Sequence, residues 1–167
     1  MMFTFGTLLD DASKLNEIMV THLRSMQETY GDIDPRLVGD QQSVALYWQK
    51  VTAKRHRLLT MIVDEQVVGF ILATPSRLSE GNIWEIRALY ILASHQRHGI
   101  GRQLLASLRG VLAEDGVEVL DILVHCKNVK ARTFFIASGA KPTQCISMSD
   151  SALGHVDTVL LRLPVDA

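Results

Sequence analysis

The stretch Gln96-Arg97-His98-Gly99-Ile100-Gly101 decides the fold prediction for this chain. It follows an apolar, β-rich run from Ile83 to Leu92, and it opens a run from Arg102 to Ala113 whose apolar residues recur at helical spacing. A strand, a glycine loop and a helix in this order bring unpaired backbone N–H groups to the positive end of a helix dipole. Because glycine lets the backbone approach a phosphate closely, the pattern predicts a site for a pyrophosphate-bearing ligand.

Three kinds of phosphate-binding loop can be compared with this stretch. A P-loop needs Lys and then Ser or Thr after its last glycine, and no such pair follows Gly101. The dinucleotide-binding fingerprint needs a third glycine at the position of Leu104; its ribose-binding acid would fall near Asp121. The third pattern, Gln/Arg-x-x-Gly-x-Gly/Ala, fits Gln96, Gly99 and Gly101 at every fixed position. The remaining alternative is a helix start with two glycines that binds no ligand.

The third pattern resembles the acetyl-CoA pyrophosphate loop of the GNAT superfamily of N-acetyltransferases. Before it, Leu89-Tyr90-Ile91 is similar to the Leu-Tyr-Val strand end of that family. After it, the residues Asn128, Ala131, Phe134 and Gly139-Ala140 resemble the second cofactor segment of the family, Asn-x-x-Ala-x-x-aromatic-Tyr followed by Gly-Phe. The resemblance covers residues 83–140, and the rest of the chain is compatible with it.

The composition is that of an ordinary soluble globular protein. The 167 residues are 47% hydrophobic and 21% charged, with a formal net charge of −1, so we expect no nucleic-acid partner. No apolar run approaches the roughly 18 residues of a membrane span, and the N-terminus shows no signal peptide. Two cysteines, Cys126 and Cys145, make neither a disulfide framework nor a metal site, so we expect a cytoplasmic protein without a bound metal.

The apolar periodicity predicts one domain over residues 1–167. A β-prone start (Phe3–Leu8) precedes two helices, one capped by Asp10 or Asp11 with apolar residues from Leu15 to Met26, the other over Gln42–Val51. Strands are predicted at 57–63, 66–74, 83–91, 117–125, 144–149 and 156–163, and helices at 102–114 and 128–138, with Gly154 in the last loop. Asp64-Glu65 between the first two of these strands predicts a hairpin turn. The order βααβββαβαββ is that of the GNAT fold, an α/β (α+β) domain with a mixed, mostly antiparallel, twisted sheet flanked by helices.

The resemblance implies which residues bind acetyl-CoA. Backbone groups of Leu89, Tyr90 and Ile91 would bind the pantetheine arm, and one N–H there would polarise the thioester oxygen. The pyrophosphate would be held by Gln96, Arg97, His98, Gly99, Ile100, Gly101 and Arg102. The second cofactor segment would contribute Asn128, Ala131, Phe134 and Phe135. Asn128 could also be the N-cap of its helix.

The chain departs from the family at a catalytic position. Many GNAT enzymes place a Tyr seven residues after the Asn, where it protonates the leaving thiolate, and this chain has Phe135 there. Either the thiolate leaves unassisted or another group, among Tyr90, Ser138 and Cys126, donates the proton. For the base, Glu85 leads and His125 is second, although Glu85 could instead form an ion pair with Arg87 or a cross-strand cation.

The acceptor is expected to be a primary amine of a small molecule or peptide. The acidic residues Glu28, Asp32, Asp34 and Asp40 could attract a cationic amine, or they could belong to a solvated loop. Trp48 and Trp84 could line a pocket or pack in the core. Two functions remain open: an acetyl-CoA-dependent N-acetyltransferase, and a non-catalytic acyl-CoA-binding domain, which Phe135 suggests. The family often dimerises through its C-terminal strands, so a homodimer is possible.

Overall fold

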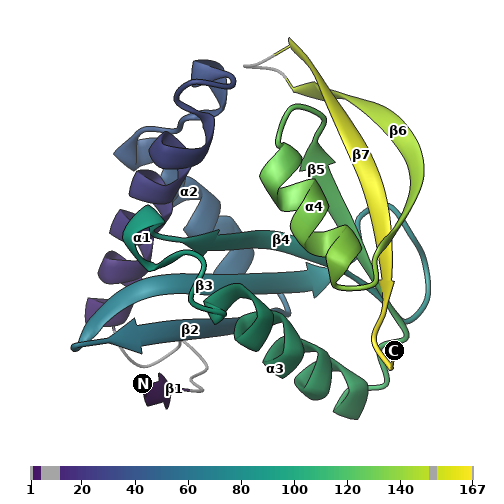
Figure 1. Cartoon of the computed structure of the whole chain (residues 1–167), viewed down its shortest axis with the longest axis horizontal. Coiled ribbons are helices and arrows are strands. Elements are labelled where there is room, and N and C mark those ends of the chain that lie inside the picture. The colour runs from purple at the N-terminus through teal and green to yellow at the C-terminus, as the bar shows by residue number, and fades with distance from the viewer. Residues whose placement is uncertain (1, 5–11, 151–153, 167) are drawn as a thin grey trace. The chain divides into compact units, whose positions relative to one another are not determined.

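The computed structural model describes residues 2–4, 12–150 and 154–166. The helices and strands follow one another in the predicted order βααβββαβαββ, which Figure 1 traces by colour along the chain. The chain folds as two compact units: unit 1 holds Met1–Thr74 and Ala88–Leu108, and unit 2 holds Pro75–Arg87 and Arg109–Ala167. The single domain over residues 1–167 stays a prediction.

Unit 1 contains an antiparallel ribbon of three strands, β1 (Met2–Thr4), β2 (Arg57–Val63) and β3 (Gln66–Pro75), of which Pro75 belongs to unit 2. Asp64 and Glu65 join β2 to β3, and both have positive φ angles, 48° and 65°. Two consecutive residues of this kind are typical of the tight turns that fit the twist of a hairpin. The predicted hairpin is confirmed.

The helices of unit 1 are α1 (Ala12–Tyr30), η2 (Pro35–Leu37) and α2 (Gln41–Thr52), and α1 and α2 lie alongside each other (Figure 1). Asp40 begins α2 with a capping box, because its carboxylate accepts the N–H of Ser43 at 2.7 Å and the Ser43 hydroxyl bonds the Asp40 backbone. The predicted cap of the first helix, Asp10 or Asp11, lies outside the described residues. The apolar core of the unit includes Ile18, Trp48, Phe70 and Leu72, all fully buried.

Unit 2 contains β5 (Val119–His125), α4 (Val129–Ala137), β6 (Lys141–Asp150) and β7 (Gly154–Pro164). β7 pairs antiparallel with both β5 and β6, whereas the first half of β4 (Ile83–Ile91) pairs parallel with β5 over Ile83–Ile86 and Val119–Ile122. The strands are hydrogen-bonded in the order β1-β2-β3-β4-β5-β7-β6. One parallel pair among antiparallel ones confirms the predicted mixed, mostly antiparallel sheet.

Some element ends differ from the prediction. Helix α3 (Ile100–Glu114) begins inside the glycine stretch, at Ile100 rather than Arg102. The last two strands are longer than predicted, and Gly154 lies in β7 opposite Asp150 instead of in a loop. The reason is that apolar periodicity reports only the buried part of a strand, while backbone pairing of this hairpin continues past it. None of the helices formed by the described residues is long and apolar enough to cross a membrane.

Candidate functional site

The end of strand β4 passes into a turn that several groups of unit 1 hold in place. The N–H of Leu92 donates to the carbonyl of Val68 at 2.9 Å, which ties the strand end to β3. The N–H of Ala93, the first residue of the short helix η3 (Ala93–His95), donates to the carboxylate of Glu28 at 2.8 Å. The side-chain amide of Gln96 donates to the carbonyl of Ile91 at 2.9 Å. These three contacts fix the position of the turn from which the glycine loop begins.

The glycine loop has the backbone conformation of an anion-binding concavity. Its φ angles change sign from residue to residue: Gln96 has −70°, Arg97 has +66° and Gly99 has +80°. Such alternation lets successive N–H groups turn toward one point, as in loops that bind phosphate. A Cβ atom placed on Gly99 would meet no protein atom within 4 Å, so the protein leaves the space beside this backbone open.

Helix α3 adds its first N–H groups to the loop. Its first internal hydrogen bond runs from the N–H of Gln103 to the carbonyl of Gly99 at 3.1 Å. The N–H groups of Ile100, Gly101 and Arg102 come before that bond, at the positive end of the helix dipole. The side chains of Arg97, His98 and Arg102 are exposed. The structure thus brings Gln96 to Arg102 together in one segment of unit 1 that fits a pyrophosphate.

Tyr90 precedes the loop on β4, and its ring packs into an aromatic cluster. The ring centroid lies 4.9 Å from that of His22 and 5.9 Å from that of Phe70. Burial, together with the neighbouring phenols and a hydrogen bond with Tyr30, raises the pKa of Tyr90, so its hydroxyl keeps its proton at neutral pH. Leu89 and Ile91, on the opposite face of the strand, are half-buried. The backbone role of all three residues stays a prediction.

His22, on α1, is the centre of that cluster. Its ring contacts those of Tyr47, Trp48, Phe70 and Tyr90. Trp48 donates its indole N–H to His22 Nδ1 at 3.1 Å, so the neutral ring carries its own proton on Nε2. Burial lowers the pKa of His22 from 6.5 to about 4. Helical spacing from Leu15 to Met26 places position 22 on the buried face of α1, but periodicity does not show which side chains surround it.

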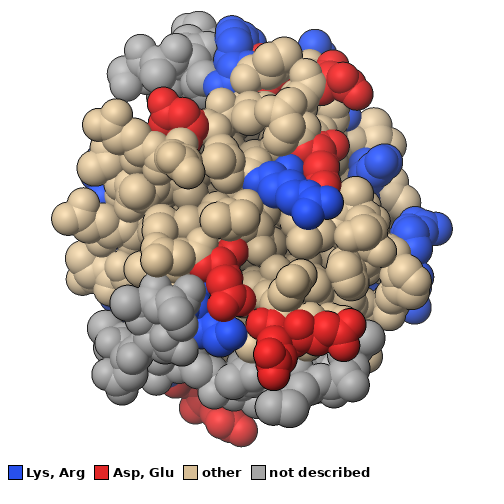
Figure 2. All heavy atoms as spheres, turned by 90° about the vertical axis from the view of Figure 1, so that its left-hand side faces the viewer, with Lys and Arg blue, Asp and Glu red and all other residues tan. Residues whose placement is uncertain are grey.

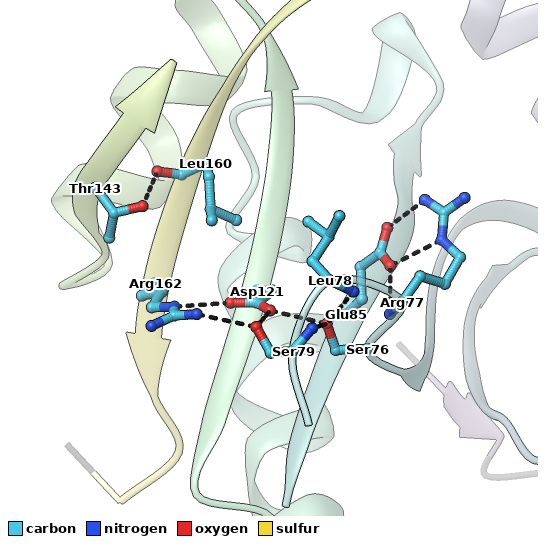
Figure 3. A network of polar contacts seen from close by, with 9 residues as sticks. All are labelled: Ser76, Arg77, Leu78, Ser79, Glu85, Asp121, Thr143, Leu160 and Arg162. Atoms are coloured by element: carbon cyan, nitrogen blue, oxygen red, sulfur yellow. Dashed lines mark hydrogen bonds and ion pairs between the residues drawn. The ribbon is translucent and has the colours of Figure 1, made fainter. Parts of the chain in front are cut away.

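Glu85, the leading candidate for the base, is held by an arginine in unit 2. Its carboxylate is 2% exposed and accepts two guanidinium N–H groups of Arg77, at 3.0 and 2.6 Å (Figure 3). Arg87, the partner considered from the sequence, lies farther away, with its Nε 3.8 Å from Glu85 Oε1. Both carboxylate oxygens are therefore engaged by Arg77, which lies in the loop between β3 and β4. To accept a proton from an amine, Glu85 must do so beside the guanidinium of Arg77 that it binds.

A second buried carboxylate, Asp121 on β5, was considered from the sequence only as a ribose-binding acid of a dinucleotide site. It is fully buried and accepts hydrogen bonds from Ser76 at 2.8 Å and from Ser79 at 2.7 Å (Figure 3). Arg162 on β7 donates from Nε to Asp121 at 3.0 Å and from Nη2 to the Ser79 hydroxyl at 2.9 Å. An acidic residue inside the apolar run of β5 was the signal, since a buried charge needs a partner.

The remaining candidates of the second cofactor segment lie in unit 2. His125 is half-buried, and its Nδ1 accepts the N–H of Lys127 at 3.1 Å. Asn128 is buried and caps α4 by accepting the N–H of Ala131 at 3.1 Å, as predicted. Phe134 and Phe135 pack edge to face with centroids 5.1 Å apart. A role of these residues in binding acetyl-CoA stays a prediction.

The two weaker candidates for a proton donor are constrained in unit 2. The hydroxyl of Ser138 donates its proton to the carbonyl of Phe134 at 2.8 Å, one turn back in the helix. Burial raises the pKa of the Cys126 thiol, with smaller contributions from Cys145 and Asp157. The hydroxyl proton of Ser138 is therefore engaged within its own helix, while the thiol of Cys126 keeps its proton at neutral pH.

The acidic residues near α1 and α2 mostly have partners within the fold. Asp34 pairs with Arg36 at 2.7 Å, Asp40 caps α2, and Glu28 bonds Ala93. Figure 2, which faces the side on which α1 and α2 lie in Figure 1, shows acidic and basic side chains interspersed. Trp48 and Trp84 are both buried, which agrees with packing in the core. Within the described ranges, no three His, Cys, Asp or Glu side chains group so that they could hold a metal ion.

Comparison with known proteins gives a consistent result. A model of the acetyltransferase (GNAT) family matches residues 17–139. The chain is 26% identical over 132 residues to the [ribosomal protein bS18]-alanine N-acetyltransferase of Salmonella typhimurium, covering 75% of this chain and 86% of that protein. The crystal structure of ribosomal-protein-alanine N-acetyltransferase from Brucella melitensis is 19% identical, with a TM-score of 0.75 over 98% of this chain and 99% of that one. The structure of yncA from Salmonella typhimurium with its cofactor acetyl-CoA is 18% identical, with a TM-score of 0.74 over 100% and 95% of the two chains.

Proposed function

Because the chain belongs to the acetyltransferase (GNAT) family, we propose that it uses acetyl-CoA to acetylate a primary amine of a small molecule or peptide, by direct transfer in a ternary complex. The family and the predicted enzyme class, an N-acetyltransferase, are confirmed by this membership. The observation that carries the proposal is the glycine loop, where Arg97 and Gly99 take left-handed conformations directly before α3. Open space beside Gly99 leaves room for a phosphate.

The loop from Gln96 to Arg102 would hold the pyrophosphate through backbone N–H groups, and the exposed Arg97 and Arg102 would add charge pairing. Bound acetyl-CoA supplies an activated acetyl thioester. The backbone of Leu89, Tyr90 and Ile91 would orient the pantetheine arm. From unit 2, we propose that Asn128, Ala131, Phe134 and Phe135 contribute to cofactor binding.

The acetyl transfer forms an N–C bond, breaks the C–S bond, and needs a group that takes one proton from the amine nitrogen. We propose Glu85 for this role, with His125 as the second candidate. Glu85 would use a lone pair that the two N–H groups of Arg77 leave available on its carboxylate. The thiolate would leave without an acid, since the hydroxyls of Ser138 and Tyr90 are otherwise used and Phe135 has none. Tyr90 thus remains a catalytic candidate mainly through its backbone.

We propose a primary amine as the acetyl acceptor. The Salmonella relative acts on an alanine of ribosomal protein bS18, which makes a peptide amine one class to test. The partnered acidic residues of α1 and α2 give no strong argument for a highly cationic acceptor. We therefore propose a panel that contains an alanine-starting peptide, a polyamine and an aminoglycoside.

The test is release of coenzyme A thiol from acetyl-CoA in the presence of each amine. Release that depends on one amine, with formation of its N-acetyl product, supports the enzyme. The alternative function, non-catalytic acyl-CoA binding, rests on the buried, hydroxyl-free Phe135. It would be favoured if the protein binds acetyl-CoA but releases no thiol with any amine of the panel. Glu85→Gln separates the two, because only an enzyme has turnover to lose.

A homodimer in the cytoplasm is the form that we propose for the working protein. Strand β6 is the last in the strand order, and most of its residues from Lys141 to Ser147 are exposed, so its edge can pair with a second copy. Light scattering of the purified protein tests this: a mass of one chain at micromolar concentration would contradict the dimer.

A further inference from the structure

Glu28 makes a contact that links helix α1 to the turn before the glycine loop. Its Oε2 accepts the N–H of Ala93 at 2.8 Å, although the two residues are 65 positions apart in the sequence. Its Oε1 accepts the Nε–H of Arg24, one turn earlier on the same helix, at 3.0 Å. The contact with Arg24 thus orients the Glu28 carboxylate, and the contact with Ala93 binds that carboxylate to the turn.

The segment that Glu28 holds leads directly to the residues that form the concavity. The turn also contains neutral hydrogen bonds: His95 N–H to Leu92 at 2.8 Å, Gln96 N–H to Ala93 at 3.3 Å, the Gln96 amide to Ile91, and Ser94 Oγ with His95 Nδ1 at 2.9 Å. Glu28 is the charged acceptor among them, and hydrogen bonds to a carboxylate are stronger than neutral ones. The left-handed conformation of Arg97 is costly for a residue with a side chain, so it persists only where its surroundings hold it.

We propose that Glu28 is a positioning residue that holds the turn Ala93–His95 so that the loop from Gln96 to Gly101 keeps its ligand-binding conformation. The inference rests on the proposed function, because it assigns Glu28 to the acetyl-CoA site. A direct contact with the pyrophosphate is not its role, since a carboxylate repels that anion. Glu28 was a candidate from the sequence for attracting a cationic acceptor; its contacts assign it to the cofactor loop instead.

A second glutamate of α1 provides a matched control. Glu17 also accepts a backbone N–H from another element, that of Val67 at 3.4 Å, and also pairs with a cation of its own helix, Lys14 at 3.3 Å. Val67 lies near the start of β3, outside the turn that leads to the glycine loop. Glu17→Ala therefore removes a similar contact from α1 to a backbone N–H of another element and leaves the bond between Glu28 and Ala93 in place.

The experiment compares wild type, Glu28→Ala, Glu28→Gln and Glu17→Ala. Calorimetry of acetyl-CoA binding is expected to show Kd raised about tenfold or more in Glu28→Ala, which is the size of one lost charge-assisted hydrogen bond. Glu28→Gln keeps a neutral acceptor oxygen for Ala93, so its Kd should lie between those of wild type and Glu28→Ala, whereas Glu17→Ala should bind like wild type. Amide hydrogen exchange without ligand should be faster over residues 93–101 in Glu28→Ala alone.

Several outcomes would overturn the inference. Equal binding by Glu28→Ala and wild type, equal loss in Glu17→Ala, or failure of Glu28→Gln to rescue would each contradict it. If wild type does not bind acetyl-CoA, the proposed function fails before any variant is compared. The exchange measurement then still decides the positioning role, because unchanged exchange over residues 93–101 in Glu28→Ala would show that Glu28 does not hold the loop.

Discussion

Glu85 and Asp121 are direct partners across the parallel pair of β4 and β5, and each buried carboxylate has its own arginine. Arg77 from the β3–β4 loop binds Glu85, and Arg162 from β7 binds Asp121. Two carboxylates side by side in a low-dielectric interior would repel each other, so their arginines are needed for stability. The same loop contributes Ser76 and Ser79 to Asp121, so both carboxylates fix its position.

Arg162→Ala is expected to destabilise the protein. It leaves the fully buried Asp121 with two serine hydroxyls but no cation. We expect the free energy of unfolding in urea to fall by about 2 kcal/mol, less than for a fully buried pair because Arg162 is 45% exposed. Arg36→Ala removes an exposed ion pair and serves as the control, with little change in the midpoint. Equal midpoints for the two variants would contradict the assignment.

Glu85→Gln should lower turnover by about a hundredfold or more, because a general base is removed, while the Kd for acetyl-CoA stays near that of wild type. Asp121→Asn is the matched control, since it neutralises the neighbouring buried carboxylate, which has no proposed catalytic role. Rates are compared well below the melting temperature of each variant. A similar loss of turnover in both variants would mean that Glu85 acts through the loop rather than as a base.

Phe135→Tyr tests whether an acid is needed. The thiolate is expected to leave unassisted, so kcat should change by less than about twofold, far from the hundredfold that a general acid can contribute. Phe135 is 5% exposed, so the added hydroxyl should also lower the melting temperature. A tenfold rise in kcat corresponds to an activation free energy lower by about 1.4 kcal/mol. It would show that protonation of the thiolate limits the reaction of the wild-type enzyme.

His22 predicts a pH dependence of stability. Its folded pKa of about 4 lies below the ordinary value of 6.5, so the unfolded chain binds a proton more readily. The resulting stabilisation is fully present above pH 6.5 and is lost as the pH falls toward 4. Between pH 7 and pH 5 this amounts to about 2 kcal/mol of unfolding free energy. His22→Gln retains an acceptor for Trp48 and should flatten this slope; an unchanged slope would contradict the assignment.

The fold could be predicted because its signals are local. The β-rich apolar runs predicted β2 and β4 with their observed ends, and Asp64-Glu65 predicted the hairpin turn between β2 and β3. The glycine loop could be predicted for the same reason, since its spacing is contained in a single segment. The partners of Glu85, Asp121 and Glu28 could not, because they come from segments whose proximity depends on strand register and helix packing. Periodicity identifies buried positions, but it does not pair charges across them.

The proposed function depends on binding of the acetyl-CoA pyrophosphate by the backbone around Gly99. The most direct test is calorimetry of acetyl-CoA binding to wild type, Gly99→Glu and Gly116→Glu. Gly116 is the matched control, because it also has a positive φ, +74° against +80°, and open space for a Cβ, but lies in the turn after α3. We predict that wild type and Gly116→Glu bind with similar Kd, while Gly99→Glu loses about a hundredfold or more in affinity, because a carboxylate opposes the anion. No binding by wild type, or equal binding by Gly99→Glu, would contradict the claim.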